Sequence, residues 1–180
     1  MTAFEQQALD FLKSRIRDVK DFPKPGIVFK DITPLLKDSE TLNLTMRLMV
    51  KPFLPEKVEL IVGLESRGFL FGPGMAMNLH AGFVPIRKPN KLPADTLSAT
   101  YQLEYGSDKV EIHADAIIRG NRVVIHDDLI ATGGTAAAAT ELVEKLGGIV
   151  VGYSFLIELE FLNGREKLKH DVPCHSLLKY

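Results

Sequence analysis

The sequence predicts an α/β fold: an open, mainly parallel twisted sheet flanked by helices. Short apolar segments typical of buried strands alternate with segments whose apolar residues recur at helical spacing. The 180 residues are sufficient for one domain with a substantial core, and we see no repeat and no linker. We therefore expect a single domain over residues 1–180, with any ligand at the carboxyl ends of the strands.

The composition excludes several classes of function. With 22 basic and 23 acidic residues the net charge is -1, which does not favour nucleic acid or a membrane surface as a partner. The single cysteine, Cys174, cannot form an internal disulfide, and no His/Cys cluster has the spacing of metal ligands. No segment reaches the ~18 apolar residues of a membrane helix, and Glu5 and Asp10 argue against a signal peptide. We expect a cytoplasmic protein.

The first third of the chain predicts two helices with an extended segment between them. Residues 3–19 and 39–54 both place apolar side chains at helical spacing, so each predicts an amphipathic helix. The proline-rich residues 22–26 disfavour regular helix and lead into an extended apolar segment at residues 27–29. An extended backbone can pair with the edge of a flat heterocycle while Phe29 stacks on its face, although Phe29 alone is equally an ordinary core aromatic.

A first anion site is predicted after the strand at residues 58–64. The loop 65–68 follows this strand, and an apolar helix is expected from there to His80. A guanidinium from Arg67 and the first N–H groups of that helix would converge on an anion at this point. The alternative is an ion pair between Arg67 and Glu65.

A cationic loop and a hairpin follow the next predicted strand, residues 83–86. Arg87, Lys88 and Lys91 lie on a proline-rich turn, which alone would be a solvated loop but beside an anion site can neutralise a leaving group. Residues 97–112 alternate apolar and polar side chains around a Gly-Ser turn, which predicts a projecting hairpin suited to act as a lid.

The central unit of the chain, residues 123–148, consists of a buried strand, a small-residue turn and an Ala-rich helix. The turn contains Ala131, Thr132, Gly133, Gly134 and Thr135. The first N–H groups of a helix lack intrahelical partners and the helix dipole favours negative charge there, so a phosphate monoester is the expected ligand. The preceding Asp127 and Asp128 would repel that phosphate, so we expect them to face ribose hydroxyls and a positive centre developing at the anomeric carbon. One more buried strand is expected at residues 149–157, followed by a short charged helix and a final apolar run.

Other phosphate motifs do not fit this turn. A Walker loop requires Lys after its last glycine, where this chain has Thr135, and the G-x-G-x-x-G fingerprint of dinucleotide-binding proteins is absent. A plain strand-to-helix connection capped by Asp128 is the remaining alternative. His126, at the end of the strand, is expected to have a core or supporting role rather than a catalytic one.

Several segments resemble one known family. The segment HDDLIATGGT resembles the 5-phosphoribosyl 1-pyrophosphate binding motif of the type I phosphoribosyltransferases. Four further segments resemble the adenine-specific members of that family. In chain order they are FPKPGIVFKDITPLL, GLESRGFLFG, IRKPNKLP and YQLEYG. The resemblance spans nearly the whole chain. It implies a type I phosphoribosyltransferase fold with a small hood from residues 20–36 and a hairpin lid at about 89–112.

The resemblance also implies a role for individual residues. Adenine would be held by Val28, Phe29 and Lys30, the last standing where many relatives carry Arg. The 5-phosphate would be held by residues 131–135, and the pyrophosphate would face Ser66, Arg67, Arg87, Lys88 and Lys91. The implied catalytic residues are Glu104, Arg67, Asp127 and Asp128, with Glu104 as proton acceptor and Tyr105 beside it in contact with substrate. A cis peptide bond is expected between Glu65 and Ser66.

The activity that the resemblance implies is transfer of the 5-phosphoribosyl group to adenine, giving AMP and pyrophosphate in purine salvage. Mg²⁺ would be bound mainly by oxygens of the substrate and by water, with no metal site built by the protein alone. A homodimer is expected, in which Lys91 or its neighbours serve the partner's site. Two alternatives stay open: a phosphoribosyltransferase for a 6-oxopurine, and a non-catalytic regulator that binds the same sugar phosphate.

Overall fold

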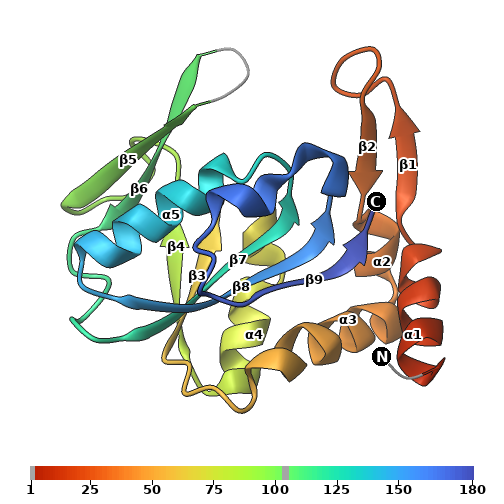
Figure 1. Cartoon of the computed structure of the whole chain (residues 1–180), viewed down its shortest axis with the longest axis horizontal. Coiled ribbons are helices and arrows are strands. Elements are labelled where there is room, and N and C mark those ends of the chain that lie inside the picture. The colour runs from red at the N-terminus through yellow and green to blue at the C-terminus, as the bar shows by residue number, and fades with distance from the viewer. Residues whose placement is uncertain (1–2, 103–105) are drawn as a thin grey trace. The chain divides into compact units, whose positions relative to one another are not determined.

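The computed structural model describes residues 3–102 and 106–180, and its contacts divide the chain into two compact units. One unit extends to Leu48 and the other begins at Met49 (Figure 1). Glu104 and Tyr105 lie outside the described residues.

The N-terminal unit combines helices with a two-stranded antiparallel sheet. Its elements are α1 (Ala3–Lys13), β1 (Arg17–Lys20), β2 (Val28–Asp31), α2 (Thr33–Lys37) and the start of α3 (Ser39–Val50). The helix predicted over residues 3–19 was therefore too long. The chain turns after Lys13, and Arg17 pairs with Asp31 both through the strand register and through a 2.9 Å hydrogen bond from its Nε. The extended segment predicted at residues 27–29 is confirmed for Val28 and Phe29, which begin β2.

The C-terminal unit contains the main sheet. Its strands are β3 (Leu60–Leu64), β4 (Gly82–Ile86), β7 (Arg122–Ile130), β8 (Ile149–Glu158) and β9 (Cys174–Lys179). They are arranged in the order β4-β3-β7-β8-β9, and every neighbouring pair is parallel. The other elements are η1 (Lys51–Phe53), η2 (Arg67–Leu70), α4 (Gly72–Leu79), the hairpin β5 (Thr96–Gln102) and β6 (Ser107–His113), α5 (Gly134–Lys145), η3 (Glu160–Leu162) and η4 (Gly164–Lys167). The α/β class and the parallel sheet are confirmed.

The direction in which successive strands are added to this sheet reverses between β3 and β7. From β3 the chain passes through α4 to β4 on one side, and from β7 it passes through α5 to β8 on the other. Because parallel crossovers are right-handed, the two helices lie on opposite faces, as Figure 1 shows. The chain leaves the carboxyl ends of β3 and β7 toward opposite faces, and open α/β sheets bind ligands at such a switch point.

The helices on both faces explain why the strands are apolar almost throughout. The side chains of Val123, Val124 and Ile125 in β7 have no exposed surface, and β8 is buried over most of its length. Small residues in α5, including Ala136 and Ala139, let this helix approach the sheet closely. No helix in the described part of the chain is both long enough and apolar enough to span a membrane.

Other parts of the structure differ from the sequence prediction. The helix predicted over residues 39–54 ends at Val50. The strand expected to end at the acidic pair continues to Ile130, because β8 pairs with it as far as Glu158. The helix expected directly after residue 68 begins only at Gly72, since η2 intervenes. The final apolar run forms β9, which adds to the parallel sheet beside β8.

Candidate active site

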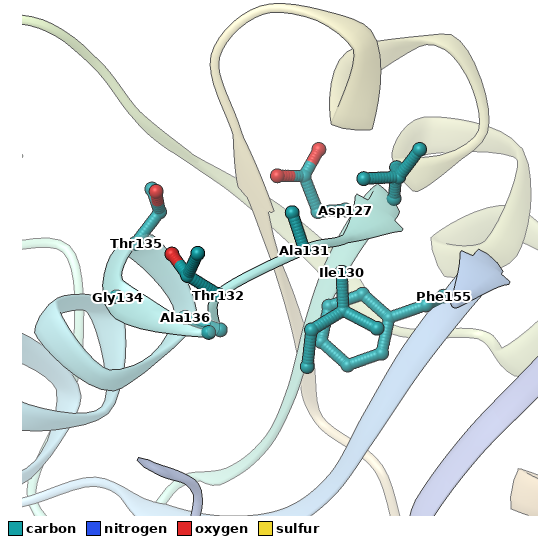
Figure 2. A pocket seen from close by; sticks show the side chains of 10 residues that line it. Asp127, Ile130, Ala131, Thr132, Gly134, Thr135, Ala136 and Phe155 are labelled. Atoms are coloured by element: carbon teal, nitrogen blue, oxygen red, sulfur yellow. The ribbon is translucent and has the colours of Figure 1, made fainter. Parts of the chain in front are cut away.

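The switch point holds a small cavity between the end of β7 and the start of α5 (Figure 2). It encloses about 90 Å³. Its lining residues are Asp127, Leu129, Ile130, Ala131, Thr132, Gly133, Gly134, Thr135, Ala136 and Phe155. Figure 2 shows Thr132 and Thr135 together on the helix side of the turn and Asp127 apart from them on the strand side. All five residues predicted to cradle a phosphate therefore line one cavity.

The turn is shaped to leave helix N–H groups available. Gly133 precedes α5 in a left-handed conformation, with φ of 74°, which glycine adopts at little cost. Glycine has no side chain to cap the helix, and the hydrogen bond from the Ala137 N–H to the Gly133 carbonyl is 3.0 Å long. The N–H groups of residues 134–136 thus precede the first helical hydrogen bond, which is the arrangement that binds anions.

The two carboxylates of β7 have different surroundings. Asp128 forms a 2.6 Å ion pair with Arg67, and only 5% of its side chain is exposed. It therefore does not serve as the helix cap that was the alternative reading of this turn. Asp127 lines the cavity, where burial, and next the negative charge of Asp128, raise its pKa well above the ordinary value. A carboxyl group held in this way gains from hydroxyl partners supplied by a ligand.

The loop after β3 reaches the acidic pair directly. Arg67 comes from this loop, so the ion pair with Asp128 joins the carboxyl ends of the two neighbouring strands. Gly68 lies so close to β7 that a Cβ there would be 3.1 Å from Oδ1 of Asp127, which explains the glycine. The expected cis peptide bond between Glu65 and Ser66 is present. The alternative prediction of an ion pair between Arg67 and Glu65 is wrong, because Glu65 pairs with Arg87 instead.

The cationic loop after β4 is organised by Glu65, which sequence reasoning did not identify as important. One carboxylate oxygen of Glu65 lies 3.1 Å from Arg87 Nη2, and the other accepts the Lys88 N–H at 2.8 Å. Burial alone would raise the pKa of Glu65, but these hydrogen bonds and the charge of Arg87 lower it overall. Arg87 also donates to the Lys91 carbonyl at 3.2 Å, and Lys91 itself is exposed. Glu65 thus holds the cations beside the loop that carries Ser66 and Arg67.

The β5–β6 hairpin contacts both halves of the site. Asp108 forms a 2.7 Å ion pair with Lys88 and accepts a 3.2 Å hydrogen bond from the Tyr101 hydroxyl. The Tyr101 hydroxyl also interacts with Thr135 of the phosphate turn. Neither Tyr101 nor Asp108 was singled out as a site residue, because alternation along a strand does not reveal what the strand faces. The hairpin itself is confirmed, whereas the proposed base Glu104 and its neighbour Tyr105 fall outside the described residues.

His126 has the core role that the sequence suggested. Its side chain is fully buried, and Nδ1 lies 3.0 Å from the Ser154 carbonyl. Burial lowers its pKa to about 4, and the Ser154 carbonyl opposes this only in part. A ring that stays neutral at physiological pH and faces Phe71 supports the strand rather than the chemistry.

The residues expected to bind adenine belong to the N-terminal unit. Val28 is 44% exposed, and the Phe29 ring packs edge-on against Phe22 at 5.2 Å. The ammonium of Lys30 forms a 2.7 Å ion pair with Asp18 on β1. The predicted contact of β2 with adenine stays a prediction.

Protein oxygen ligands for a metal at this site would come from the acidic pair. Among residues 3–102 and 106–180, no three His, Cys, Asp or Glu side chains are grouped so that they could hold a metal ion. Asp127 and Asp128 supply oxygen atoms of the kind that Mg²⁺ prefers, but one of them is already paired with Arg67.

Comparison with known proteins places these features in one family. The phosphoribosyl transferase domain matches residues 35–177. An adenine phosphoribosyltransferase of Koribacter versatilis is 56% identical over 171 residues, which are 95% of this chain and 93% of that protein. The crystal structure of adenine phosphoribosyltransferase from Rhodothermus marinus superposes with a TM-score of 0.94 at 54% identity, covering 97% of this chain and 99% of that one. The enzyme from Saccharomyces cerevisiae, solved with an imino-altritol bisphosphate and adenine, gives a TM-score of 0.89 at 46% identity, covering 96% and 99%.

Proposed function

This chain belongs to the phosphoribosyl transferase domain family and, within it, to the adenine phosphoribosyltransferases, and from that premise we propose how its residues divide the reaction. The enzyme transfers the 5-phosphoribosyl group from 5-phosphoribosyl 1-pyrophosphate to adenine, giving AMP and pyrophosphate in purine salvage. The observation that carries our assignment of roles is a series of contacts at the switch point. Asp127 lines the cavity of the phosphate turn, Asp128 pairs with Arg67, and Glu65 of the same loop as Arg67 pairs with Arg87 of the cationic loop.

The sugar phosphate binds at this switch point. Its 5-phosphate enters the cradle of residues 131–135, where helix N–H groups and two threonine hydroxyls donate to the oxygens. The ribose lies over Asp127 and Asp128, which accept hydrogen bonds from its hydroxyls. The pyrophosphate faces the opposite loops, toward Ser66 and Arg67 and the cations at Arg87, Lys88 and Lys91. The 2.6 Å ion pair between Arg67 and Asp128 supports this arrangement, since it places the loop after β3 directly beside the acidic pair of β7.

The chemical step exchanges one bond at the anomeric carbon for another. The bond to the pyrophosphate oxygen breaks, and its electron pair leaves with the pyrophosphate, whose charge the cationic loop stabilises. Positive charge that develops on the sugar is stabilised by the nearby carboxylates. The new bond forms to a ring nitrogen of adenine, and Glu104 accepts the ring proton that must depart.

Adenine is recognised by the hood segment at β2. Backbone groups near Val28 and Lys30 pair with the 6-amino donor and the N1 acceptor of adenine, and Phe29 stacks on the ring. A 6-oxopurine reverses both groups and would leave two buried polar groups unpaired, which is a strong basis for rejection. The adenine bound in the yeast relative supports this substrate.

We further propose that the enzyme is a cytoplasmic homodimer that works with Mg²⁺. When bound, Mg²⁺ would neutralise pyrophosphate charge. Substrate oxygens and water would supply most of its ligands, and Asp127 and Asp128 would be the nearby protein oxygens. The exposed Lys91 on the cationic loop, and apolar side chains exposed elsewhere on the same unit at Leu70 and Met77, support packing against a second copy. Sedimentation at assay concentration should give a dimer, and an active monomer would remove this part of the proposal.

Product formation with three purines tests the function. The enzyme should convert adenine and 5-phosphoribosyl 1-pyrophosphate to AMP, with kcat/KM for hypoxanthine and guanine lower by about 10⁴ or more. Comparable turnover of hypoxanthine or guanine would instead favour a phosphoribosyltransferase for a 6-oxopurine. Binding of the sugar phosphate without product from any of the three would favour a regulator.

A further inference from the structure

We propose that the turn formed by Asn163, Gly164 and Arg165 positions the phosphate cradle. The turn lies about thirty residues beyond the cradle in sequence and does not line the cavity. It is a positioning element, acting on the 5-phosphate through the backbone of Gly133. This proposal rests on the assignment of residues 131–135 as the phosphate site.

The contact between the turn and the cradle is backbone against backbone. A Cβ on Gly133 would overlap the carbonyl oxygen of Gly164, so the two peptide groups are packed with no room for a side chain. A Cβ on Gly164 would in turn overlap the Ala131 carbonyl oxygen and lie 3.0 Å from the Gly133 nitrogen. Both glycines are needed for this approach, and Gly133 is the residue whose left-handed conformation directs the N–H groups that follow it.

The turn is itself anchored to the sheet by Arg165. Its guanidinium forms a bidentate pair with Glu158 at 2.5 and 2.6 Å and also donates to the Cys174 carbonyl at 2.9 Å and to Ser176 Oγ at 3.2 Å. The Glu158 side chain is only 9% exposed, and bidentate pairs of this kind fix orientation as well as distance. The end of β8 and the first half of β9 therefore hold the turn in place.

The same anchor is connected to the strand that leads into the cradle. Glu158 lies opposite Ile130 in the sheet register, and the Leu159 N–H donates to the Ile130 carbonyl at 3.0 Å. The cradle is thus held at its start by the sheet and in its middle by Gly164. A cradle fixed at two points is already in its binding conformation, so little ordering cost is added when the phosphate enters.

Calorimetry with two separate ligands tests the proposal. In Gly164→Ala the added Cβ should displace residues 131–133, and the Kd for ribose 5-phosphate should rise at least about tenfold, as expected when one charge-assisted hydrogen bond is lost. The Kd for pyrophosphate, which faces the opposite loops, should stay within about twofold of wild type. Arg165→Gln should raise the Kd for ribose 5-phosphate in the same direction, and Arg165→Lys should restore part of the affinity because it keeps a charged donor.

Gly120→Ala is the matched control for loss of a glycine. Gly120 has φ of 92° but nothing within 4 Å of an added Cβ, so this variant should lose stability without losing affinity for ribose 5-phosphate. Thermal unfolding of each variant shows whether it is folded. If Gly164→Ala does not fold, the Kd values of Arg165→Gln and Arg165→Lys decide the result.

The outcomes separate this proposal from the assignment of the cradle. Thr135→Ala removes a hydroxyl of the cradle itself and should weaken ribose 5-phosphate binding in any case. If Thr135→Ala weakens binding but Gly164→Ala and Arg165→Gln do not, the turn has no positioning role. Equal losses for ribose 5-phosphate and pyrophosphate would likewise overturn it, as the effect would then be general. If Thr135→Ala also binds ribose 5-phosphate normally, the phosphate site itself is misassigned.

Discussion

At the scale of single residues, Asp127 and Asp128 show how adjacent positions on a strand acquire different tasks. Asp127 lines the cavity and Asp128 pairs with Arg67, while a side-chain hydrogen bond joins the two carboxyl groups. Burial raises the pKa of both carboxyl groups. At Asp128 the charge of Arg67 opposes this increase, whereas at Asp127 the negative charge of Asp128 raises the pKa further. Asp128 is therefore the more readily ionised of the two before substrate binds.

His126 should make the protein less stable in acid. Because burial holds its pKa at about 4 in the folded chain, against 6.5 ordinarily, the unfolded chain takes up a proton below pH 6.5 that the folded chain does not. The contribution of this group to the free energy of unfolding is therefore fully present above pH 6.5 and falls by about 3 kcal/mol as the pH drops to 4.

Urea unfolding of wild type and of His126→Asn at pH 7, 5.5 and 4.5 isolates this effect. Loss of the ring lowers the free energy of unfolding of the variant by the same amount at every pH. The neighbouring residues Phe71, Ser154 and Asp127 are common to both proteins. The stability difference between the two proteins should shift against wild type by most of those ~3 kcal/mol by pH 4.5. A difference that does not change with pH would show that His126 is protonated in the folded state as easily as in the unfolded one.

Glu104→Gln should slow the chemical step. A general base typically contributes about 10²- to 10⁴-fold, so the single-turnover rate of AMP formation should fall by that factor, with little change in affinity for the sugar phosphate. Single turnover is the right measurement because slow product release can hide a chemical defect in the steady state. A rate within about threefold of wild type would show that Glu104 is not the base, since a base contributes at least about 10²-fold.

At the scale of elements, the hairpin contacts two residues that our proposal assigns to substrate binding. Asp108 on β6 occupies Lys88, and Tyr101 on β5 interacts with Thr135. The base of the hairpin is also fixed, because Arg87 and Glu111 exchange backbone hydrogen bonds at 2.9 and 2.7 Å. Substrate that takes Lys88 and Thr135 must therefore release contacts beyond this fixed base, toward the turn of the hairpin.

Asp108→Asn should tighten pyrophosphate binding. The hydrogen bond and charge of Asp108 raise the pKa of Lys88 and tie up its ammonium, but the pair is partly exposed, and such pairs are worth about 0.2 to 1 kcal/mol. The Kd for pyrophosphate should accordingly fall by about 1.4- to 5-fold in calorimetry. Glu141→Gln removes the same charge from an exposed pair with Lys145 on α5 and should leave this Kd unchanged. A Kd that rises in Asp108→Asn would instead make Asp108 part of the binding surface.

The elements themselves were largely predictable because their signals are local. The apolar runs of β3, β7 and β8 and the small-residue turn before α5 are each specified within about ten residues. Errors occurred where pairing decided the outcome: residues 17–20 form a strand because β2 lies beside them, and residues 174–179 join the sheet because β8 offers an open edge. Glu65, Tyr101 and Asp108 were missed for the same reason, since their partners lie 20 or more residues away or on another element.

At the scale of the whole molecule, the topology explains why the site lies where it does. The order β4-β3-β7-β8-β9 places the reversal between β3 and β7, and both motifs identified in the sequence follow these two strands. The phosphate turn and the Arg67 loop are about sixty residues apart along the chain, yet parallel pairing of β3 with β7 brings their ends together. The sequence motifs predicted each half of the site, and only the strand order shows that the halves adjoin.

Calorimetry on one variant of the phosphate turn and one of the Arg67 loop tests most directly whether the first binds the 5-phosphate and the second the pyrophosphate. Gly134→Val places a side chain in the cradle and should raise the Kd for ribose 5-phosphate at least about a hundredfold, the loss of two charge-assisted hydrogen bonds, while leaving the Kd for pyrophosphate unchanged. Arg67→Gln should do the reverse, with pyrophosphate affinity lost and ribose 5-phosphate affinity kept. If each folded variant weakened both ligands equally, or if the two effects were exchanged, the two loops would not divide the substrate as described.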